Sequence, residues 1–599
     1  YIGNQPGTGV RNRFIYTATA SQTTFSGADD NSKTLKYADS NYIDVYLNGV
    51  CLEPGTDYTA STKTSVVLTQ AASLNDTLKV IAYDVASMDD SISKADGGTF
   101  EANVTFADGA DIITATAGTD NVRLGENAGD SITSGGNNNV TIGKDAGTAI
   151  TTGDANVAVG FEALATEDAN GQNVAVGYRA LKTLNAGTEA QNTAVGYNAG
   201  TSITTGVENV LVGATAGDAI TDADFNVGIG WGALGANVLG SKSVAVGTGV
   251  LDAQNPASAT DMHNTAVGHG AGGAVTTGIK NTIVGSTAGD ALTTGDSSVA
   301  IGFGALTSET AASNSIAIGQ TALENQNIGS GDSHNIAIGR NAGGQITSGI
   351  NNVLIGGYTG DATDDGEANT AVGYLALSAN CGDGNSVLGS TAGMVITGEN
   401  NTTLGVASGR GITSGSNNIT IGSQAGRSGS PGGNITTGSN EIGLGDGNIS
   451  SFSCQVSLTA TSDERDKTDF QDLDLGLAFV KELKPVTYVW DKRINYGDVT
   501  ADDFDLDSIT SDGTHKDDDL QVGFKAQEVI ALEDSAGYKL SDKTNLTATV
   551  TSDGKQYGLM YERFVPILTK AIQELSAKVD ALETENTAIK ARLDALEAG

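Results

Sequence analysis

The chain has 599 residues, including 81 glycines, with 38% hydrophobic and 5% aromatic residues and a formal net charge of −39. So small an apolar share argues against one large globular core, and glycines without a period of three exclude a collagen triple helix. Because 71 acidic residues outnumber 32 basic ones, the surface repels phosphate backbones and anionic membranes, and we expect neither nucleic-acid binding nor membrane insertion.

Residues 1–90 alternate short strand-forming runs with turn signals, which predicts a compact antiparallel β-sandwich. Asn48-Gly49 marks a hairpin and Pro54-Gly55 marks a second turn. The segment resembles small β-domains of bacteriophage tail-fibre proteins, which implies a joint or attachment module without chemistry of its own. Residues 91–120 follow as a predicted connector.

Residues 121–447 repeat one short phrase: NTAVGYNAGTSITTG at 192–206 returns as NTIVGSTAGDALTTG at 281–295. Most steps between copies are 17 residues, and Asn stands four residues before the first Gly of nearly every copy. Eighteen copies are clear, and a degenerate nineteenth lies near Gly443. Their first glycines are Gly125, Gly143, Gly160, Gly177, Gly196, Gly213, Gly230, Gly247, Gly268, Gly285, Gly302, Gly319, Gly339, Gly356, Gly373, Gly389, Gly405 and Gly422, and Ser replaces Asn at Ser243, Ser298 and Ser315.

A period of 17 residues is too short for a helical hairpin or a propeller blade and fits one coil of a β-solenoid. Alternating β-branched residues, as in Val157-Ala158-Val159, predict a brief strand with one face inward. The corner Gly supplies positive φ or a close backbone approach. The Asn tolerates left-handed backbone and can form a ladder from coil to coil. A small residue three positions after the Gly predicts a tight second corner.

The copies are of two kinds, which alternate in pairs through Gly356. One kind continues as AG followed by ITTG, and the other carries AL, often with an aromatic residue directly after the corner Gly. Four copies make a larger unit of 71 or 72 residues that bears one enlarged loop, for recognition or by neutral insertion. The aromatic row either stacks on sugars or packs at the corner. It comprises Phe161, Tyr178, Trp231, Phe303 and Tyr374, and the loops lie at 189–191, 255–263 and 330–334.

The phrase N/S-x-A-x-G resembles the head repeats of trimeric autotransporter adhesins. This resemblance covers residues 121–447 and implies a left-handed parallel β-roll in a homotrimer. An intertwined triple-stranded β-helix is the alternative. Either arrangement adds neighbours to a coil whose small residues bury little surface alone.

After residue 447 the repeat ends, and large apolar and charged residues return; residues 448–461 form a predicted neck. Three motifs follow: TSDERDK at 461–467, GFKAQEV at 523–529 and YGLMYERFVPILTKAIQEL at 557–575. Apolar residues then recur at 4-3 spacing, which predicts a coiled coil over 565–597. Asn586 falls at an a position, where a polar residue fixes register and strand number. The apolar seam is Ile572, Leu575, Val579, Leu582, Ile589, Leu593 and Leu596.

Residues 462–599 resemble the intramolecular chaperone domain of phage tailspikes and fibres, the endosialidase-type family also classed as peptidase S74. The resemblance implies that the domain trimerises the fibre and then cuts itself off just before the Ser of the family signature. Three departures bear on efficient cleavage, namely Asp466, Phe470 and an acidic, flexible insertion at 498–519. The signature Ser-Asp-x-Arg-x-Lys is matched by Ser462, Asp463, Arg465 and Lys467, and GFKAQEV matches a second family motif.

Self-cleavage between Thr461 and Ser462 is chemically sensible for these residues. A Ser hydroxyl is a poor nucleophile until a base removes its proton, and a Lys such as Lys467 can serve when burial depresses its pKa. Ser–Lys pairs are a known variant of the Ser–His–Asp arrangement. Attack on the neighbouring carbonyl is intramolecular, so we expect a single-turnover serine reaction and no turnover of an external substrate.

Cysteines and targeting signals add little. Cys51, Cys381 and Cys454 are odd in number and far apart, so we expect neither a disulfide framework nor a metal site. No cofactor is expected, although the acidic surface leaves structural Ca²⁺ open. No apolar run is long enough to span a bilayer and no signal peptide is found, while Tyr1 in place of Met leaves room for an upstream segment.

The sequence thus predicts a mainly β protein: an N-terminal β-sandwich, a parallel β-solenoid of about nineteen coils, and an α+β C-terminal domain ending in a trimeric coiled coil. The expected function is a homotrimeric bacteriophage tail fibre, located in the virion and assembled in the host cytoplasm. Its expected partners are phage tail or adaptor proteins through the N-terminal region and a host surface receptor, glycan or protein. The alternatives are a polysaccharide-depolymerising tailspike and a bacterial surface adhesin.

Overall fold

The structure is a computed structural model, and it describes residues 10–84, 117–456, 458–498, 501 and 504–599. The chain forms two compact units, Tyr1–Ile112 and Ile113–Gly599, each described by itself. Of the predicted connector 91–120, only residues 117–120 fall within the described part. The predicted fold class, mainly β with a long parallel solenoid and few helices, is confirmed.

Two antiparallel sheets pack over one core in the N-terminal unit. Asn48 and Gly49 both have positive φ, 50° and 87°, as the tight hairpin that they form requires. Phe14, Phe25 and Val80, from both sheets, are buried in the shared core. In spatial order, one sheet is β1 (Val10–Thr17), β7 (Thr77–Asp84), β3 (Ile43–Leu47) and β4 (Val50–Cys51), and the other is β2 (Gln22–Ser26), β6 (Ser65–Ala72) and β5 (Tyr58–Thr59); the 3₁₀ turn η1 (Ser40–Tyr42) precedes β3.

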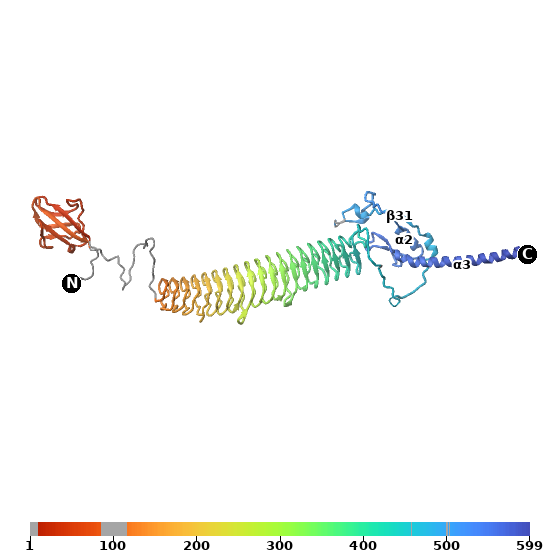
Figure 1. Cartoon of the computed structure of the whole chain (residues 1–599), viewed down its shortest axis with the longest axis horizontal. Helices are drawn as coiled ribbons and strands as arrows, with labels where there is room; N and C mark the ends of the chain where they lie inside the picture. The colour runs from red at the N-terminus through yellow and green to blue at the C-terminus, as the bar shows by residue number, and fades with distance from the viewer. Residues whose placement is uncertain (1–9, 85–116, 457, 499–500, 502–503) are drawn as a thin grey trace. The chain divides into compact units, whose positions relative to one another are not determined.

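Residues 122–444, here called the shaft, form a β-solenoid in which each coil adds one three-residue strand to a single parallel sheet (Figure 1). Each strand pairs in register with the strand of the next coil of the same chain. This is the β-roll arrangement, because an intertwined helix would pair strands of different chains. The nineteen strands are β8 (Val122–Leu124), β9 (Val140–Ile142), β10 (Val157–Val159), β11 (Val174–Val176), β12 (Thr193–Val195), β13 (Val210–Val212), β14 (Val227–Ile229), β16 (Val244–Val246), β18 (Thr265–Val267), β19 (Thr282–Val284), β20 (Val299–Ile301), β22 (Ile316–Ile318), β24 (Ile336–Ile338), β25 (Val353–Ile355), β26 (Thr370–Val372), β27 (Ser386–Leu388), β28 (Thr402–Leu404), β29 (Ile419–Ile421) and β30 (Ile442–Leu444).

Two of the enlarged loops carry short strands of their own. In the second four-coil unit, β15 (Gly240–Ser241) pairs in parallel with β17 (Thr260–Asp261). In the third unit, β21 (Ala312–Ser313) pairs in the same way with β23 (Gly331–Asp332). The loops are therefore anchored by backbone hydrogen bonds to the neighbouring coil.

The corner glycines stack too closely for any side chain. Gly230 has φ +136°, and a Cβ placed on it would lie 2.1 Å from the carbonyl oxygen of Gly247 in the next coil. The same approach, with distances of 2.1–2.7 Å to the next carbonyl oxygen, recurs along the column from Gly125 to Gly405. The positive φ and the close approach that the sequence predicts are both present.

The Asn side chains form a buried column, which links each coil to the next. Asn226 Oδ1 accepts a hydrogen bond from the backbone N–H of Ser243 at 3.0 Å, and its Nδ2 donates to the carbonyl of Gly240 at 3.0 Å. Its own N–H donates to Asn209 Oδ1 at 3.0 Å. The predicted ladder exists, but most of its bonds run from side-chain amide to backbone, so it satisfies buried backbone groups at the corner.

In most strands of the shaft, the smaller residue faces the core and the larger residues face outward. From β9 to β30 the central residue, most often Ala as in Ala158 and Ala245, is buried. The flanking Val or Ile side chains, such as Val157 and Val159, point outward and are half-exposed. The predicted inward face therefore exists; its residue is small in most strands and larger in a few, such as Leu211 and Ile283.

The two kinds of coil fill this narrow core differently. Coils of the first kind place an Ile in the core seven residues after the corner Gly, as at Ile203 and Ile220. Coils of the second kind place a Leu four residues after it, as at Leu164 and Leu234. The first kind needs Gly where the second has Leu, because a Cβ on Gly200 would already lie 3.0 Å from neighbouring Ile and Leu methyl groups. The four-coil unit is therefore a packing pattern.

The C-terminal domain, residues 462–599, is α+β. Its core joins Phe479, Val529 and Phe564, so the GFKAQEV and YGLMYERF motifs meet in one cluster. The rings of Phe524 and Phe564 stack with centroids 5.4 Å apart. The elements are the 3₁₀ turn η3 (Glu464–Asp466), α1 (Leu477–Glu482), β31 (Val486–Tyr488), η4 (Arg493–Tyr496), η5 (Leu506–Ser508), β32 (Gln521–Gly523), α2 (Ala526–Ser535), β33 (Ala548–Val550), β34 (Tyr557–Leu559), η6 (Tyr561–Arg563) and α3 (Phe564–Glu597); β31 pairs with β32 and β33 with β34, both antiparallel.

Candidate functional site

The SDERDK motif forms a turn that its own side chains hold in place. Asp463 caps η3 by accepting a hydrogen bond from the N–H of Arg465 at 2.9 Å. The Arg465 guanidinium donates two hydrogen bonds to the same carboxylate, from Nη2 to Oδ2 at 2.7 Å and from Nε to Oδ1 at 3.1 Å. This side-chain pair, together with the backbone bond, holds the pKa of Asp463 below its ordinary value, so the turn keeps its charged cap.

The turn brings Lys467 back onto Ser462. Lys467 Nζ lies 2.5 Å from Ser462 Oγ and 3.3 Å from the Ser462 carbonyl oxygen. Thr461, whose carbonyl would be attacked, is exposed directly before the serine. The four signature residues thus form two contacts, one that shapes the turn and one that pairs a nucleophile with a candidate base.

Within a single chain, the candidate base is not buried. Ser462 and Lys467 are both exposed, as is Arg465. A lysine acts as a base when burial favours its neutral form, so this expectation is not met within one chain. Asp466 lies exposed in the turn and Phe470 is 67% exposed. An exposed Phe beside the motif leaves apolar surface uncovered within the single chain.

The segment that begins at Ser462 is similar to a known protein family. Residues 462–538 match the family Peptidase_S74, described as chaperone of endosialidase. These residues form an S74 chaperone domain. No curated protein and no solved structure matches the chain. Placed after a long β-solenoid, the S74 domain fits a tail fibre or tailspike with a C-terminal chaperone.

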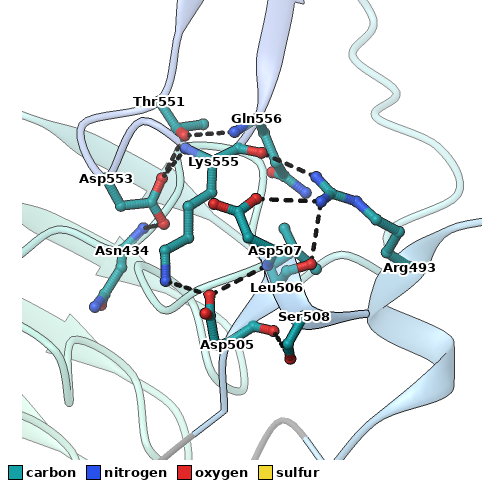
Figure 2. Close-up of polar contacts among 10 residues, drawn as sticks. All are labelled: Asn434, Arg493, Asp505, Leu506, Asp507, Ser508, Thr551, Asp553, Lys555 and Gln556. Atoms are coloured by element: carbon teal, nitrogen blue, oxygen red, sulfur yellow. Dashed lines mark hydrogen bonds and ion pairs between the residues drawn. The ribbon is translucent and has the colours of Figure 1, made fainter. Parts of the chain in front are cut away.

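The S74 domain and the hairpin β33–β34 meet the last coils of the shaft, as Figure 2 shows. The backbone N–H of Asn434 donates to Asp553 Oδ2 at 3.0 Å, across 119 residues of sequence. Burial alone would raise the pKa of Asp553, but hydrogen bonds from Thr551 and from the backbone N–H groups of Asn434 and Lys555 lower it below 3.8. The charged carboxylate is therefore the form that holds this contact.

The insertion at 498–519 belongs to the same junction. Lys555 Nζ lies 2.8 Å from Asp505 Oδ1, and Arg493 donates to the carbonyl oxygens of Leu506 and Lys555 at 3.0 and 2.9 Å (Figure 2). Leu506 is fully buried. Residues 504–508 of the insertion thus have a buried leucine and paired charges, while its flexibility stays a prediction. Sequence patterns did not reveal this junction, since its partners are far apart in the chain.

The predicted coiled coil is a single helix, α3, and its apolar seam has no partner within the described part of the chain. Ile572 is 66% exposed and Leu582 is 63% exposed. Asn586 lies exposed on the same helix at its a position. A helix that presents a heptad seam to water is stabilised when other helices cover that seam.

Aromatic side chains form a row on the surface of the shaft. The rings of Phe161, Tyr178 and Tyr197 stack with centroids 5.3 and 5.2 Å apart. Tyr197 and Trp231 are nevertheless more than half exposed. Part of the row therefore packs on itself, whereas stacking on sugars stays a prediction.

No group of three metal-ligating side chains occurs among the described residues. No helix in that part of the chain combines the length and apolar character needed to cross a membrane.

Proposed function

We propose that this protein is a homotrimeric bacteriophage tail fibre whose C-terminal domain aligns three chains and then releases itself by cutting before Ser462. The observation that carries the proposal is the 2.5 Å contact between Lys467 and Ser462 at the start of an S74 domain that follows a β-solenoid. The exposed apolar seam of α3 supports the trimer.

The proposed chemistry is an acyl shift followed by hydrolysis. Lys467, once neutral, takes the hydroxyl proton of Ser462, and Oγ attacks the carbonyl carbon of Thr461. The C–N bond between these residues breaks, the Ser462 nitrogen takes a proton from the lysine, and an ester joins Thr461 to Oγ. Water then cleaves the ester. Proximity makes the first step fast once the base is neutral.

The need for a chaperone follows from the repeat. Each coil resembles the next, so three chains can pair out of register by one coil at little cost. A C-terminal trimer sets the register before the shaft closes. Removing it later takes away the nucleus for unfolding, which makes the shaft kinetically stable.

The fibre belongs to the virion and assembles in the host cytoplasm, with its N-terminal β-sandwich joining phage tail or adaptor proteins. A host surface receptor, glycan or protein, binds the shaft. The exposed part of the aromatic row, including Trp231, favours a glycan, because indole and phenol rings stack on sugar faces.

Expression of the wild type and of Ser462→Ala tests the proposal. The wild type should yield a product of 461 residues that runs as a trimer on native gels, while the variant stays full length at 599 residues. Full-length bands from both proteins would remove the cleavage step. A mature shaft with the mass of one chain would remove the trimer.

A polysaccharide-depolymerising tailspike is the second candidate, favoured only by the exposed aromatic side chains. Incubating the mature shaft with host surface glycans separates the two candidates. Shortened glycan chains indicate a depolymerase, and binding without shortening indicates a receptor-binding fibre.

A further inference from the structure

The shaft carries a long surface with an unusual composition: the outer face of its parallel sheet. Each of the nineteen strands is three residues long and presents its first and third side chains outward. Thirty-two of these thirty-eight positions are Val, Ile or Leu, and in these strands none is charged. The six exceptions are Thr193, Thr265, Thr282, Thr370, Ser386 and Thr402.

This composition is not that of a surface in water. Soluble surfaces carry about a quarter to a third of charged residues. The chain as a whole has 71 acidic residues, yet these outward strand positions have none. The acidic side chains lie on other parts of the coil, for example Glu208 and Asp222, both exposed.

The distribution of apolar residues across each strand also indicates that its outer side is covered in the assembly. A sheet with one face in water alternates apolar and polar residues, whereas strands that are apolar on both sides have both sides covered. Here each strand turns one residue inward, most often Ala as in Ala158, and two outward, most often Val or Ile. The side of the strand with more apolar surface is therefore the side that the single chain leaves uncovered. Val210 is 37% exposed and Leu404 is 42% exposed.

We infer that the outer sheet face of the shaft is the interface between the three copies of the chain, with the three sheets facing a common axis that runs along the solenoid. This inference rests on the trimer of the proposed function and assigns the surface that forms it.

A second copy is the occupant that fits. The cover must be apolar and uncharged, and it must extend along all nineteen strands with the same repeat. The chain itself presents such a strip. Parallel copies in the same register also place the seams of their α3 helices in a position to pair, so one assembly covers both exposed apolar surfaces.

Charge supports the same arrangement. Three chains of net charge −39 repel one another, and this repulsion is smallest when acidic side chains point away from the axis. The sheet face is the side of the coil whose outward strand positions carry no charge, so it is the side on which three such shafts approach most closely.

A pair of matched cysteine variants tests the inference. In a background of Cys51→Ser and Cys454→Ser, which removes the exposed thiols, Val210→Cys lies on the sheet face and Thr205→Cys lies on the neighbouring coil away from it. Both positions are exposed in the single chain. We expect the thiol at position 210 to react with a maleimide at least tenfold more slowly than the thiol at position 205 in the native protein, and equally fast after denaturation.

Mass measurement by light scattering keeps this result distinct from the proposed function. A trimer in which both thiols react equally fast overturns the interface and leaves the trimer intact. A single chain overturns both. Val210→Glu is expected to reduce the yield of trimer strongly while Thr205→Glu does not, and a Val210→Glu trimer formed in normal yield would also contradict the inference.

Discussion

Lys467 donates a hydrogen bond to the hydroxyl of Ser462 from five residues further along the chain, through a turn that Asp463 caps. The contact places a candidate base on the nucleophile before any other chain is present. The site is nevertheless open to water, because both side chains are exposed. Geometry is thus set locally, whereas the desolvation that a lysine base needs is not provided by this turn.

Replacing Lys467 by Arg should stop the cut and spare the trimer. The guanidinium keeps the charge and the donors but does not give up a proton, so it cannot act as a base. We expect cleavage to slow by at least about 100-fold. The 461-residue band on denaturing gels, followed over time, measures this. Lys481→Arg, on the exposed face of α1, should cleave at the wild-type rate; rapid cleavage of Lys467→Arg would show that the lysine is not the base.

The corner glycines should not tolerate replacement by any residue with a side chain. Gly230→Ala places a Cβ 2.1 Å from a backbone oxygen that cannot move without unstacking the coil, and we expect a loss of more than about 4 kcal/mol. Gly249→Ala is the control, because its Cβ would meet nothing within 4 Å and Arg179 occupies the equivalent position. It should cost only about 1 kcal/mol. Thermal unfolding followed by circular dichroism measures the stability of both variants. Equal melting points would contradict a steric role for the corner glycine.

The four-coil units also predict a coupled pair. Ser243 donates to buried Gln254 at 3.2 Å, and Asn264 Nδ2 donates to the same amide oxygen at 3.0 Å. The first unit has Asn173 and Leu184 at the positions of Ser243 and Gln254. Gln254→Leu alone leaves buried polar groups without partners and should cost about 1–3 kcal/mol.

Adding Ser243→Asn to that variant should recover most of the loss, because it recreates the pair of the first unit. A double-mutant cycle on thermal stability measures the coupling. Strictly additive effects of the two substitutions would show that the pairs are independent.

The sequence revealed those features that each coil needs for itself. The corner Gly, the Asn column and the period follow from backbone conformation and recur at fixed positions, as at Gly230 and Asn226. The sidedness of the strand did not follow. Val157-Ala158-Val159 is apolar throughout, and three residues are too few to show a polar alternation. The buried central residue ranges from Ala158 to Leu211 and Val387, so residue size does not show which side faces in either.

The candidate site was likewise only partly predictable from the sequence. The motif was enough to place Lys467 against Ser462, because both lie in one turn. It was not enough to predict the exposure of that lysine, since burial depends on which segments pack over the turn. The contact between Asn434 and Asp553 leaves no sequence signal, because it joins single polar groups 119 residues apart.

Asn586 should limit the assembly to one register and one number of chains. Replacing it by Leu adds an apolar a residue to the seam of α3, so the coiled coil should become more stable and less selective. In the Ser462→Ala background, which keeps α3 attached, we expect a higher melting temperature and a mixture of oligomers by light scattering. Asn586→Gln, which keeps an amide, is the control. A pure trimer from Asn586→Leu would contradict this role.

Acid should loosen the junction between the shaft and the C-terminal domain. The folded pKa of Asp553 lies below 3.8, so its stabilisation is complete above that pH and is lost as the pH falls through the lower folded value. The pKa of Asp505 is lowered as well, by its hydrogen bond from Lys555 and the N–H of Asp507, so its contribution disappears in the same direction.

Spin labels at Gly432→Cys and Ser552→Cys report this contact in the Ser462→Ala protein with its exposed native cysteines replaced. The two positions flank the bond from Asn434 to Asp553, and both accept a label: a Cβ placed on Gly432 would meet nothing within 4 Å, and Ser552 is exposed. We expect a narrow distance distribution at neutral pH that broadens as the pH falls through the folded pKa of Asp553, which is lowered from its ordinary value. Asp553→Asn should broaden it already at neutral pH. A distribution that stays narrow in Asp553→Asn, with the shaft still folded, would mean that the carboxylate does not hold the junction.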